Sequence, residues 1–237
     1  MDQHELPLIH WEDAYLLIVE KPQGLPTQPL PRPEPVEGLP SSVSLASLLA
    51  QKYPELKSVG GSDWGAVHRL DRDTSGLVVF ARNEKNYRAL RAAFSHGDVE
   101  KEYTALVIGD VTQPGRIDWP IGADPQSSRK VKVFRNLKEA KRFKAQEALT
   151  TLTPIPSPAE GRGVTTLLTI TIKTGVRHQI RAHLAAIGHP IVGDPLYGPK
   201  PVAPGGLCLH ASRIRFYHPV TGQPVVVVSP YIRGSFP

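Results

Sequence analysis

The chain has 237 residues, of which 28 are Lys or Arg and 22 are Asp or Glu, so its formal net charge is +6. A single cysteine, Cys208, excludes an internal disulfide framework and a cysteine-based zinc finger. No apolar run approaches the roughly 18 residues of a membrane span, and the N-terminus lacks the basic segment of a signal peptide. These features predict a soluble, cytoplasmic protein without a membrane partner, and the positive charge favours a polyanionic partner.

Short β-branched runs and apolar stripes of helical spacing follow one another along the chain. Apolar residues at helical spacing predict three helices, one capped by Ser44, one around Leu90 and one that ends at Gly188. Segment 138–149 has the composition of a helix, but its neighbours suggest a meander. The mixture predicts an α+β fold and not a doubly wound parallel sheet. The predicted strands are 14–20, 76–81, 103–108, 166–173 and 224–229.

Two proline-rich segments, near 29–40 and 153–163, differ from the rest of the chain. Each contains the pattern Pro-x-Pro-x-Glu-Gly, at 33–38 and at 156–161. Two copies are too few for a repeat architecture, which needs at least about three stacked units. We therefore expect inserted surface loops with polyproline character.

A loop rich in charged residues precedes the predicted strand 76–81. Residues 67–76 read Val-His-Arg-Leu-Asp-Arg-Asp-Thr-Ser-Gly, so that Asp71 is flanked by Arg69 and Arg72. Neighbouring arginines keep a carboxylate ionised at neutral pH, which suits a nucleophile or a general base. The alternative is a cluster of surface ion pairs, which are commoner than active sites.

Basic and aromatic side chains gather at three further places. Arg177 and Arg181 lie four residues apart at the start of the third helix, so they would share a face that could bind a phosphate or the Asp71 carboxylate. Tyr103 opens a strand and could stack on a base or belong to the core. Segment 129–144 is either a footprint for a phosphate backbone or a solvated face. Its eight basic residues are Arg129, Lys130, Lys132, Arg135, Lys138, Lys141, Arg142 and Lys144.

Several strings in the chain resemble those of one enzyme family. Residues 68–77 read His-Arg-Leu-Asp-Arg-Asp-Thr-Ser-Gly-Leu, which closely resembles the signature of pseudouridine synthases of the large-subunit ribosomal RNA type. Four other segments resemble motifs of the same family, in the family's order. They are Glu-Lys-Pro-Gln-Gly at 20–24, Lys-Glu-Tyr at 101–103, the segment 178–194 and the closing segment 209–222.

The resemblance implies a fold, a reaction and a set of site residues. It implies one catalytic domain over residues 1–237, built on a long, mostly antiparallel bent sheet flanked by helices and loops, in which 138–149 is a strand. The implied reaction isomerises uridine to pseudouridine in ribosomal RNA or transfer RNA, without a metal or organic cofactor. Asp71 would be the catalytic carboxylate, either attacking the ribose or removing its 2′ proton. Arg181 would pair with Asp71, and Tyr103 would stack on the displaced uracil.

The remaining implied contacts are to RNA. Arg69 could fill the gap left by the flipped base, with His68 and Lys21 nearby. The family usually has Gly-Arg-x-His-Gln before the catalytic arginine, whereas here Gly175 is followed by Val176 and then Arg177. The family arginine is either displaced by one position or lost and replaced by another. The landmarks begin by about residue 14, so we expect no N-terminal module of the ribosomal S4 type, and we expect a monomer. The predicted RNA-binding residues are Arg69, His68, Lys21, Arg72, Arg177, Lys130 and Lys132.

Two other functions remain open from the residues. An RNA-binding or ribosome-assembly protein could retain the fold without catalysis, although it would not need Asp71, Tyr103 and Arg181 together. A hydrolase could pair Asp71 with Asp73, but a general acid with a raised pKa is not expected beside Arg72.

Overall fold

A computed structural model of the chain describes residues 6–29, 43–155, 165–200, 202 and 205–229. The proline-rich loops predicted near 29–40 and 153–163 lie mostly outside these residues. The chain divides into two compact units, one comprising Met1–Val99 and Ala211–Pro230, the other Glu100–His210 and Tyr231–Pro237. The single catalytic domain expected from the family resemblance stays a prediction. Within the described residues, no helix is both long and apolar enough to cross a membrane.

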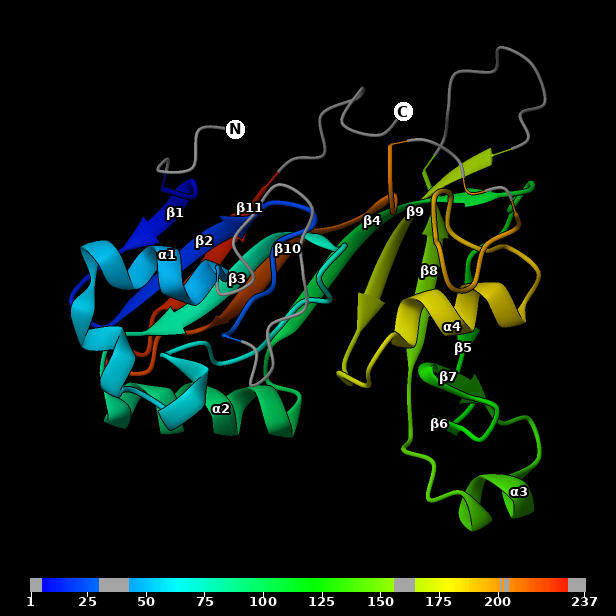
Figure 1. Cartoon of the computed structure of the whole chain (residues 1–237), viewed down its shortest axis with the longest axis horizontal. Helices are drawn as coiled ribbons and strands as arrows, with labels where there is room; N and C mark the ends of the chain where they lie inside the picture. The colour runs from blue at the N-terminus through cyan, green and yellow to red at the C-terminus, as the bar shows by residue number, and fades with distance from the viewer. Residues whose placement is uncertain (1–5, 30–42, 156–164, 201, 203–204, 230–237) are drawn as a thin grey trace. The chain divides into compact units, whose positions relative to one another are not determined.

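The first unit contains a sheet with a helix on each side. Figure 1 shows α1 (Leu45–Lys52) and α2 (Glu84–His96) on opposite sides of the strands. β1 pairs with β2, β2 with β3 and β10 with β11, all antiparallel. The strand order is β1 (Ile9–Glu12), β2 (Leu16–Lys21), β3 (Ser75–Ala81), β10 (Leu209–Tyr217, in this unit from Ala211) and β11 (Pro224–Val228). Two short 3-10 turns, Pro54–Ser58 and Gly61–Asp63, follow α1.

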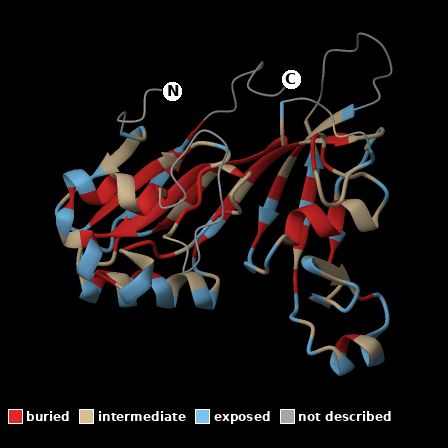
Figure 2. Ribbon diagram, viewed as in Figure 1, coloured by how far each residue is buried: buried red, intermediate tan, exposed pale blue. Residues whose placement is uncertain are grey.

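Both faces of β2 and β3 are buried, which accounts for the unbroken apolar runs in these two strands. Successive strand residues point to opposite faces. Leu16 and Ile18 pack in one cluster with Leu90 of α2, whereas Leu17 and Val19 on the opposite face are also fully buried. Figure 2 accordingly shows β2 and β3 almost entirely as buried. Strands covered on both faces lose the apolar–polar alternation of a half-exposed sheet.

The first helix begins where its sequence predicts. The Ser44 side chain accepts the backbone N–H of Ser47 at 3.1 Å, and the Ser47 hydroxyl accepts the N–H of Ser44 at 2.8 Å. This reciprocal capping box satisfies N–H groups that have no partner within the helix.

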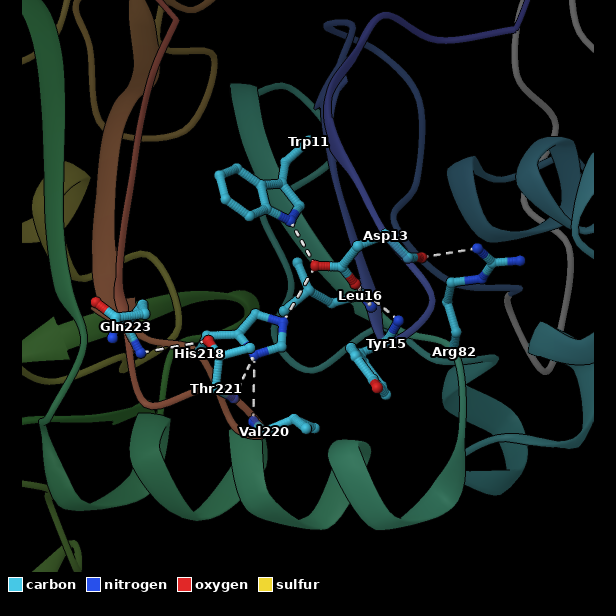
Figure 3. Close-up of polar contacts among 9 residues, drawn as sticks. All are labelled: Trp11, Asp13, Tyr15, Leu16, Arg82, His218, Val220, Thr221 and Gln223. Carbon is cyan, nitrogen blue, oxygen red and sulfur yellow. Dashed lines mark hydrogen bonds and ion pairs between the residues drawn. The ribbon is translucent and has the colours of Figure 1, made fainter.

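A histidine joins the turn between β10 and β11 to the turn between β1 and β2 (Figure 3). The Nδ1 atom of His218 accepts the backbone N–H groups of Val220 and Thr221, at 3.2 and 3.1 Å. Its proton is therefore assigned to Nε2, which donates to the Asp13 carboxylate at 3.1 Å. The same carboxylate accepts the N–H of Tyr15 at 2.7 Å, so one His–Asp pair fixes both turns.

The second unit contains an antiparallel sheet and a separate hairpin. In the sheet, β4 (Glu100–Ile108) pairs with β9 (Thr165–Ile172), β9 with β8 (Thr150–Pro154) and β8 with β5 (Gly115–Ile117). The hairpin consists of β6 (Ile121–Asp124) and β7 (Ser127–Val133). Two helices complete the unit, α3 (Leu137–Arg142) and α4 (Gln179–Ala186). Every residue of α4 from Gln179 to Leu184 is buried, as Figure 2 shows, so this helix belongs to the core of the unit.

These elements confirm the α+β class with mostly antiparallel strands. The five predicted strands correspond to β2, β3, β4, β9 and β11, and the three predicted helices to α1, α2 and α4. In β9, Leu168, Ile170 and Ile172 are buried while the threonines between them are not, as their alternation predicts. Cys208 is fully buried, and burial raises the pKa of its thiol to about 11.

The strand expected over 138–149 is wrong. The segment begins with α3, because Asn136 caps it and its side chain accepts the N–H groups of Lys138 and Glu139. Ala140 is the buried residue of this helix, and Lys144 adopts a left-handed backbone with φ of 50° just after the helix ends. Local composition and the cap therefore determine the structure here.

Candidate active site

Asp71 lies in a loop that is held by the segment before α1. Residues of that segment bind Leu70 and Arg72, the two neighbours of Asp71 in the sequence. The backbone of Leu70 is held by Thr27, whose hydroxyl accepts its N–H at 3.2 Å and donates to its carbonyl at 3.1 Å. The carbonyl of Arg72 accepts the backbone N–H of Gly24 at 3.0 Å, and the Arg72 Nε donates to the Gly24 carbonyl at 3.1 Å. Asp71, between these two residues, is half-buried. The backbone on both sides of Asp71 is thus fixed, and a fixed backbone helps to position a side chain for catalysis.

Lys21 completes this support from beneath the loop. Its side chain is 0 % exposed, and its Nζ donates to the carbonyls of Leu25 at 2.7 Å, Arg72 at 2.8 Å and Pro22 at 2.9 Å. Burial lowers the pKa of Lys21 to about 7, although the charges of Asp73 and Asp71 oppose the shift. The structure thus gives Lys21 a different place from the RNA contact predicted for it: it supports the backbone of the Asp71 loop.

His68 and Arg69 differ in how firmly they are held. The Nε2 atom of His68 accepts the backbone N–H of Val79 at 3.1 Å, and its ring stacks on Phe94 with centroids 4.5 Å apart. His68 is therefore packed between β3 and α2. Arg69 is exposed beside it, as a side chain that inserts into RNA would have to be.

Close packing explains why position 76, where the loop meets β3, is a glycine. Gly76 has φ of 111°, and a Cβ there would lie 2.5 Å from the backbone nitrogen of Ala211 and closer still to its carbonyl oxygen. Only glycine permits this approach of β3 to β10. Part of the signature at 68–77 is thus explained by packing and not by chemistry.

Tyr103 and Lys101 lie on the same face of β4. Both side chains are buried, at 7 % and 8 % exposure. Burial lowers the pKa of Lys101 to about 8, and its Nζ lies 3.4 Å from the carbonyl of Thr174, just before α4. The stacking of Tyr103 on a uracil stays a prediction.

Arg181 is buried in α4 and forms an ion pair within its own unit. Its Nε and Nη2 donate to the two carboxylate oxygens of Asp194 at 2.8 and 2.9 Å, and both side chains are at most 3 % exposed. Burial alone would raise the pKa of Asp194. The Arg181 guanidinium and the N–H groups of Tyr197 and Leu196 outweigh burial, so this pKa is lowered and Asp194 is ionised. The pairing of Arg181 with Asp71 stays a prediction.

Arg177 does not share a helix face with Arg181, contrary to the prediction from their spacing. The helix begins only at Gln179, after His178, whose backbone is left-handed with φ of 54°. The exposed Arg177 guanidinium instead donates to the carbonyls of Ser128 and Arg129 on β7, at 3.3 and 3.0 Å.

The basic segment 129–144 is divided between β7, α3 and the turns around them. Lys132 pairs with Glu139 at 2.7 Å, and Arg135 lies over the Trp119 ring at 4.4 Å while donating to the carbonyl of Ala186. Lys138, Lys141 and Arg142 on α3, by contrast, are exposed. The segment is thus neither one continuous face nor wholly solvated.

Two residues of this site were not singled out from the sequence. Thr27 lies 43 residues from Leu70, which it holds, and spacing could not identify it. Asp194 ends the family segment 178–194, but nothing there indicated that it pairs with Arg181. Among the described residues, no group of three or more His, Cys, Asp or Glu side chains could hold a metal ion.

Comparison with known proteins gives consistent matches. The family model described as RNA pseudouridylate synthase matches residues 15–186. Ribosomal large subunit pseudouridine synthase D of Yersinia pestis is 33 % identical over 240 residues, which cover 92 % of this chain and 65 % of the relative. The protein of the same name from Xanthomonas campestris pv. campestris is 34 % identical, covering 95 % of this chain and 66 % of its own length. The chain thus spans slightly less than two thirds of these relatives.

A solved structure shows the same fold. Human RNA Pseudouridylate Synthase Domain Containing 1 superposes with a TM-score of 0.74 at 22 % identity, over 99 % of this chain and 89 % of that one.

Proposed function

Since the chain belongs to the RNA pseudouridylate synthase family, we propose that it isomerises uridine to pseudouridine in RNA. Large-subunit ribosomal RNA is the first substrate to test, because the relatives that match most of the chain are named for it. Transfer RNA is the second. The observation that carries the proposal is the Asp71 loop, which Thr27 and Lys21 hold by the backbone on either side of an ionisable side chain.

The proposed reaction needs no external reagent. The N1–C1′ bond of uridine breaks, the uracil turns while it remains bound, and C5 then bonds to C1′. The hydrogen on C5 leaves as a proton, and N1 gains one, so that substrate and product are isomers. An enzyme for this reaction must hold the ribose and the detached base at the same time.

Asp71 is the proposed catalytic carboxylate. It either adds to C1′ of the ribose or removes the 2′ proton, and both roles need the ionised form. Backbone contacts on either side of Asp71 hold the loop that carries this carboxylate.

Arg181 and Tyr103 are proposed to act with Asp71. Asp194 fixes the Arg181 guanidinium in one plane by two hydrogen bonds, and the guanidinium held in this way is proposed to contact the catalytic carboxylate. Tyr103 offers an aromatic ring, on which a detached uracil can stack and still rotate. RNA would be gripped by the basic groups Arg69, Arg72, Arg177, Lys130 and Lys132, with His68 nearby. We propose Lys21 as a positioning residue, because its ammonium is buried. A cytoplasmic, monomeric enzyme is part of the same proposal.

Mapping of pseudouridine tests the function. Unmodified large-subunit ribosomal RNA and transfer RNA transcripts would be incubated with the protein, treated with a carbodiimide that marks pseudouridine, and read by primer extension. New stops at defined uridines, absent without protein, are the expected result. Tight RNA binding with no new stop in either pool would instead support an RNA-binding protein that retains the fold.

A further inference from the structure

Two side chains, Arg177 before α4 and Tyr197 after it, form hydrogen bonds with the backbone of β7 in the β6–β7 hairpin. Arg177 donates to the carbonyls of Ser128 and Arg129 at 3.3 and 3.0 Å. Tyr197 accepts the backbone N–H of Val131 at 2.8 Å through its hydroxyl oxygen. The two side chains thus bind three backbone groups of β7, the carbonyls of Ser128 and Arg129 and the N–H of Val131.

Tyr197 also contacts the residues that place Arg181. Its ring centroid lies 5.4 Å from the Arg181 guanidinium carbon, and its backbone N–H donates to Asp194 at 3.0 Å. Asp194 in turn holds Arg181 through two hydrogen bonds. The Tyr197 hydroxyl lies 3.1 Å from Nδ1 of His178, the residue that precedes the first turn of α4. One side chain thus meets the hairpin by its hydroxyl and Arg181 by its ring.

The hairpin contains cations at this point. Lys130 lies next to the tethered Val131, and its Nζ is 5.8 Å from the centroid of the Tyr197 ring. Arg129 on the same strand is exposed. RNA phosphates attracted by these groups would bind to a hairpin whose position depends on Tyr197.

We infer that Tyr197 is a positioning residue that couples the RNA-gripping β6–β7 hairpin to Arg181. This inference rests on the proposed function. The hydroxyl holds the hairpin and so affects RNA affinity. The ring packs against Arg181 and so affects the chemical step. Spacing along the chain indicates neither of these contacts.

Two substitutions separate the two contacts. Tyr197→Phe removes the hydroxyl and keeps the ring, whereas Tyr197→Leu removes both. Tyr217→Phe is the matched control, because it deletes the hydroxyl of a tyrosine that is 65 % exposed in the other unit. Release of tritium from RNA labelled at uridine C5 would be followed in single turnovers at increasing enzyme concentration, which gives a half-saturating concentration and a maximal rate.

Tyr197→Phe removes the hydroxyl's contacts with Val131 and with His178. We expect the half-saturating concentration to rise about 3- to 10-fold, as the loss of the hydrogen bond to the hairpin predicts, with the maximal rate within about twofold of wild type. For Tyr197→Leu we expect the maximal rate to fall as well, by about tenfold or more, while the control behaves as wild type. An unchanged half-saturating concentration in Tyr197→Phe would overturn the inference. Equal maximal rates in the two variants would overturn it too, since a merely structural loss would not separate them.

Hydrogen exchange tests the tether without any turnover. Tyr197→Phe removes the acceptor of the Val131 N–H, so this amide should exchange faster than in wild type and in Tyr217→Phe. Unchanged exchange at Val131 would overturn the tether. If wild type released no tritium from any RNA while Val131 exchanged faster in Tyr197→Phe, the proposed function would fail and the tether would stand.

Discussion

Replacing Lys21 by Met tests whether the buried ammonium holds the Asp71 loop. Met has a similar length and no branch, so it fills the same space without a donor. The substitution removes the partner of three carbonyls, those of Pro22, Leu25 and Arg72. Only the Arg72 carbonyl belongs to the loop, and it lies next to Asp71 in sequence. Loss of Lys21 should therefore lower both the stability of the first unit and the rate of catalysis.

The magnitude follows from the burial of each partner. The hydrogen bond to Leu25 is buried, so its carbonyl would be left unsatisfied at about 1–3 kcal/mol. The bonds to Pro22 and Arg72 are partly buried and cost less, because water can reach them. The substitution also removes a buried charge, and this offsets part of the lost unfolding free energy. We expect a net loss of about 2–4 kcal/mol, or roughly 5–15 °C in Tm for a chain of this size.

Urea unfolding at pH 7 and single-turnover tritium release measure the two effects. Lys85→Met is the matched control, because Lys85 is exposed on α2. We expect the control to unfold within about 0.5 kcal/mol of wild type. A Lys21→Met protein as stable as the control, with an unchanged maximal rate, would refute the role of Lys21 in supporting the loop.

Three further predictions concern the same supports. The difference in unfolding free energy between wild type and Lys21→Met should widen as pH rises from about 7 towards 9, by up to about 1.4 kcal/mol per pH unit, because the unfolded chain keeps a proton that the folded Lys21 has lost. A difference that narrows over this pH range in urea titrations would contradict this prediction. Thr27→Val keeps the shape of the side chain but removes both hydrogen bonds to Leu70, so it should cost about 1–3 kcal/mol of unfolding free energy and slow single-turnover tritium release. Wild-type values in both assays would show that Lys21 alone suffices to hold the loop. Asp194→Asn leaves the buried Arg181 charge unpaired, so it should cost about 3–5 kcal/mol in urea unfolding and reduce the maximal rate, and a stable, fully active variant would remove the pair from the account.

The sequence predicted those elements whose stabilising contacts lie within a few residues along the chain. Ser44 begins α1 because its cap partner lies three residues away, and the alternation in β9 follows from its own pleat. In segment 138–149 the helical composition agrees with α3, which ends at Arg142, and the strand inferred from the family resemblance was wrong. Asn136, which caps α3, stands just before that segment.

The supports of the site could not be predicted in the same way. Lys21 and Arg72 lie 51 residues apart, and nothing in either neighbourhood indicates that an ammonium meets that carbonyl. The spacing of Arg177 and Arg181 suggested one helix face, but the left-handed backbone of His178 delays the start of α4. The family signature identified Asp71 as the candidate carboxylate, whereas the backbone contacts that hold it became visible only in the fold.

Tritium release from RNA labelled at uridine C5, with wild type beside Asp71→Asn, tests the central claim most directly. C5 must lose its hydrogen when it bonds to C1′, so release reports isomerisation and not binding. Asn has the size of Asp and no charge, and RNA binding measured in parallel controls for folding. The account predicts release by wild type alone, with RNA affinity nearly unchanged in Asp71→Asn. Release at the wild-type rate by Asp71→Asn would contradict it.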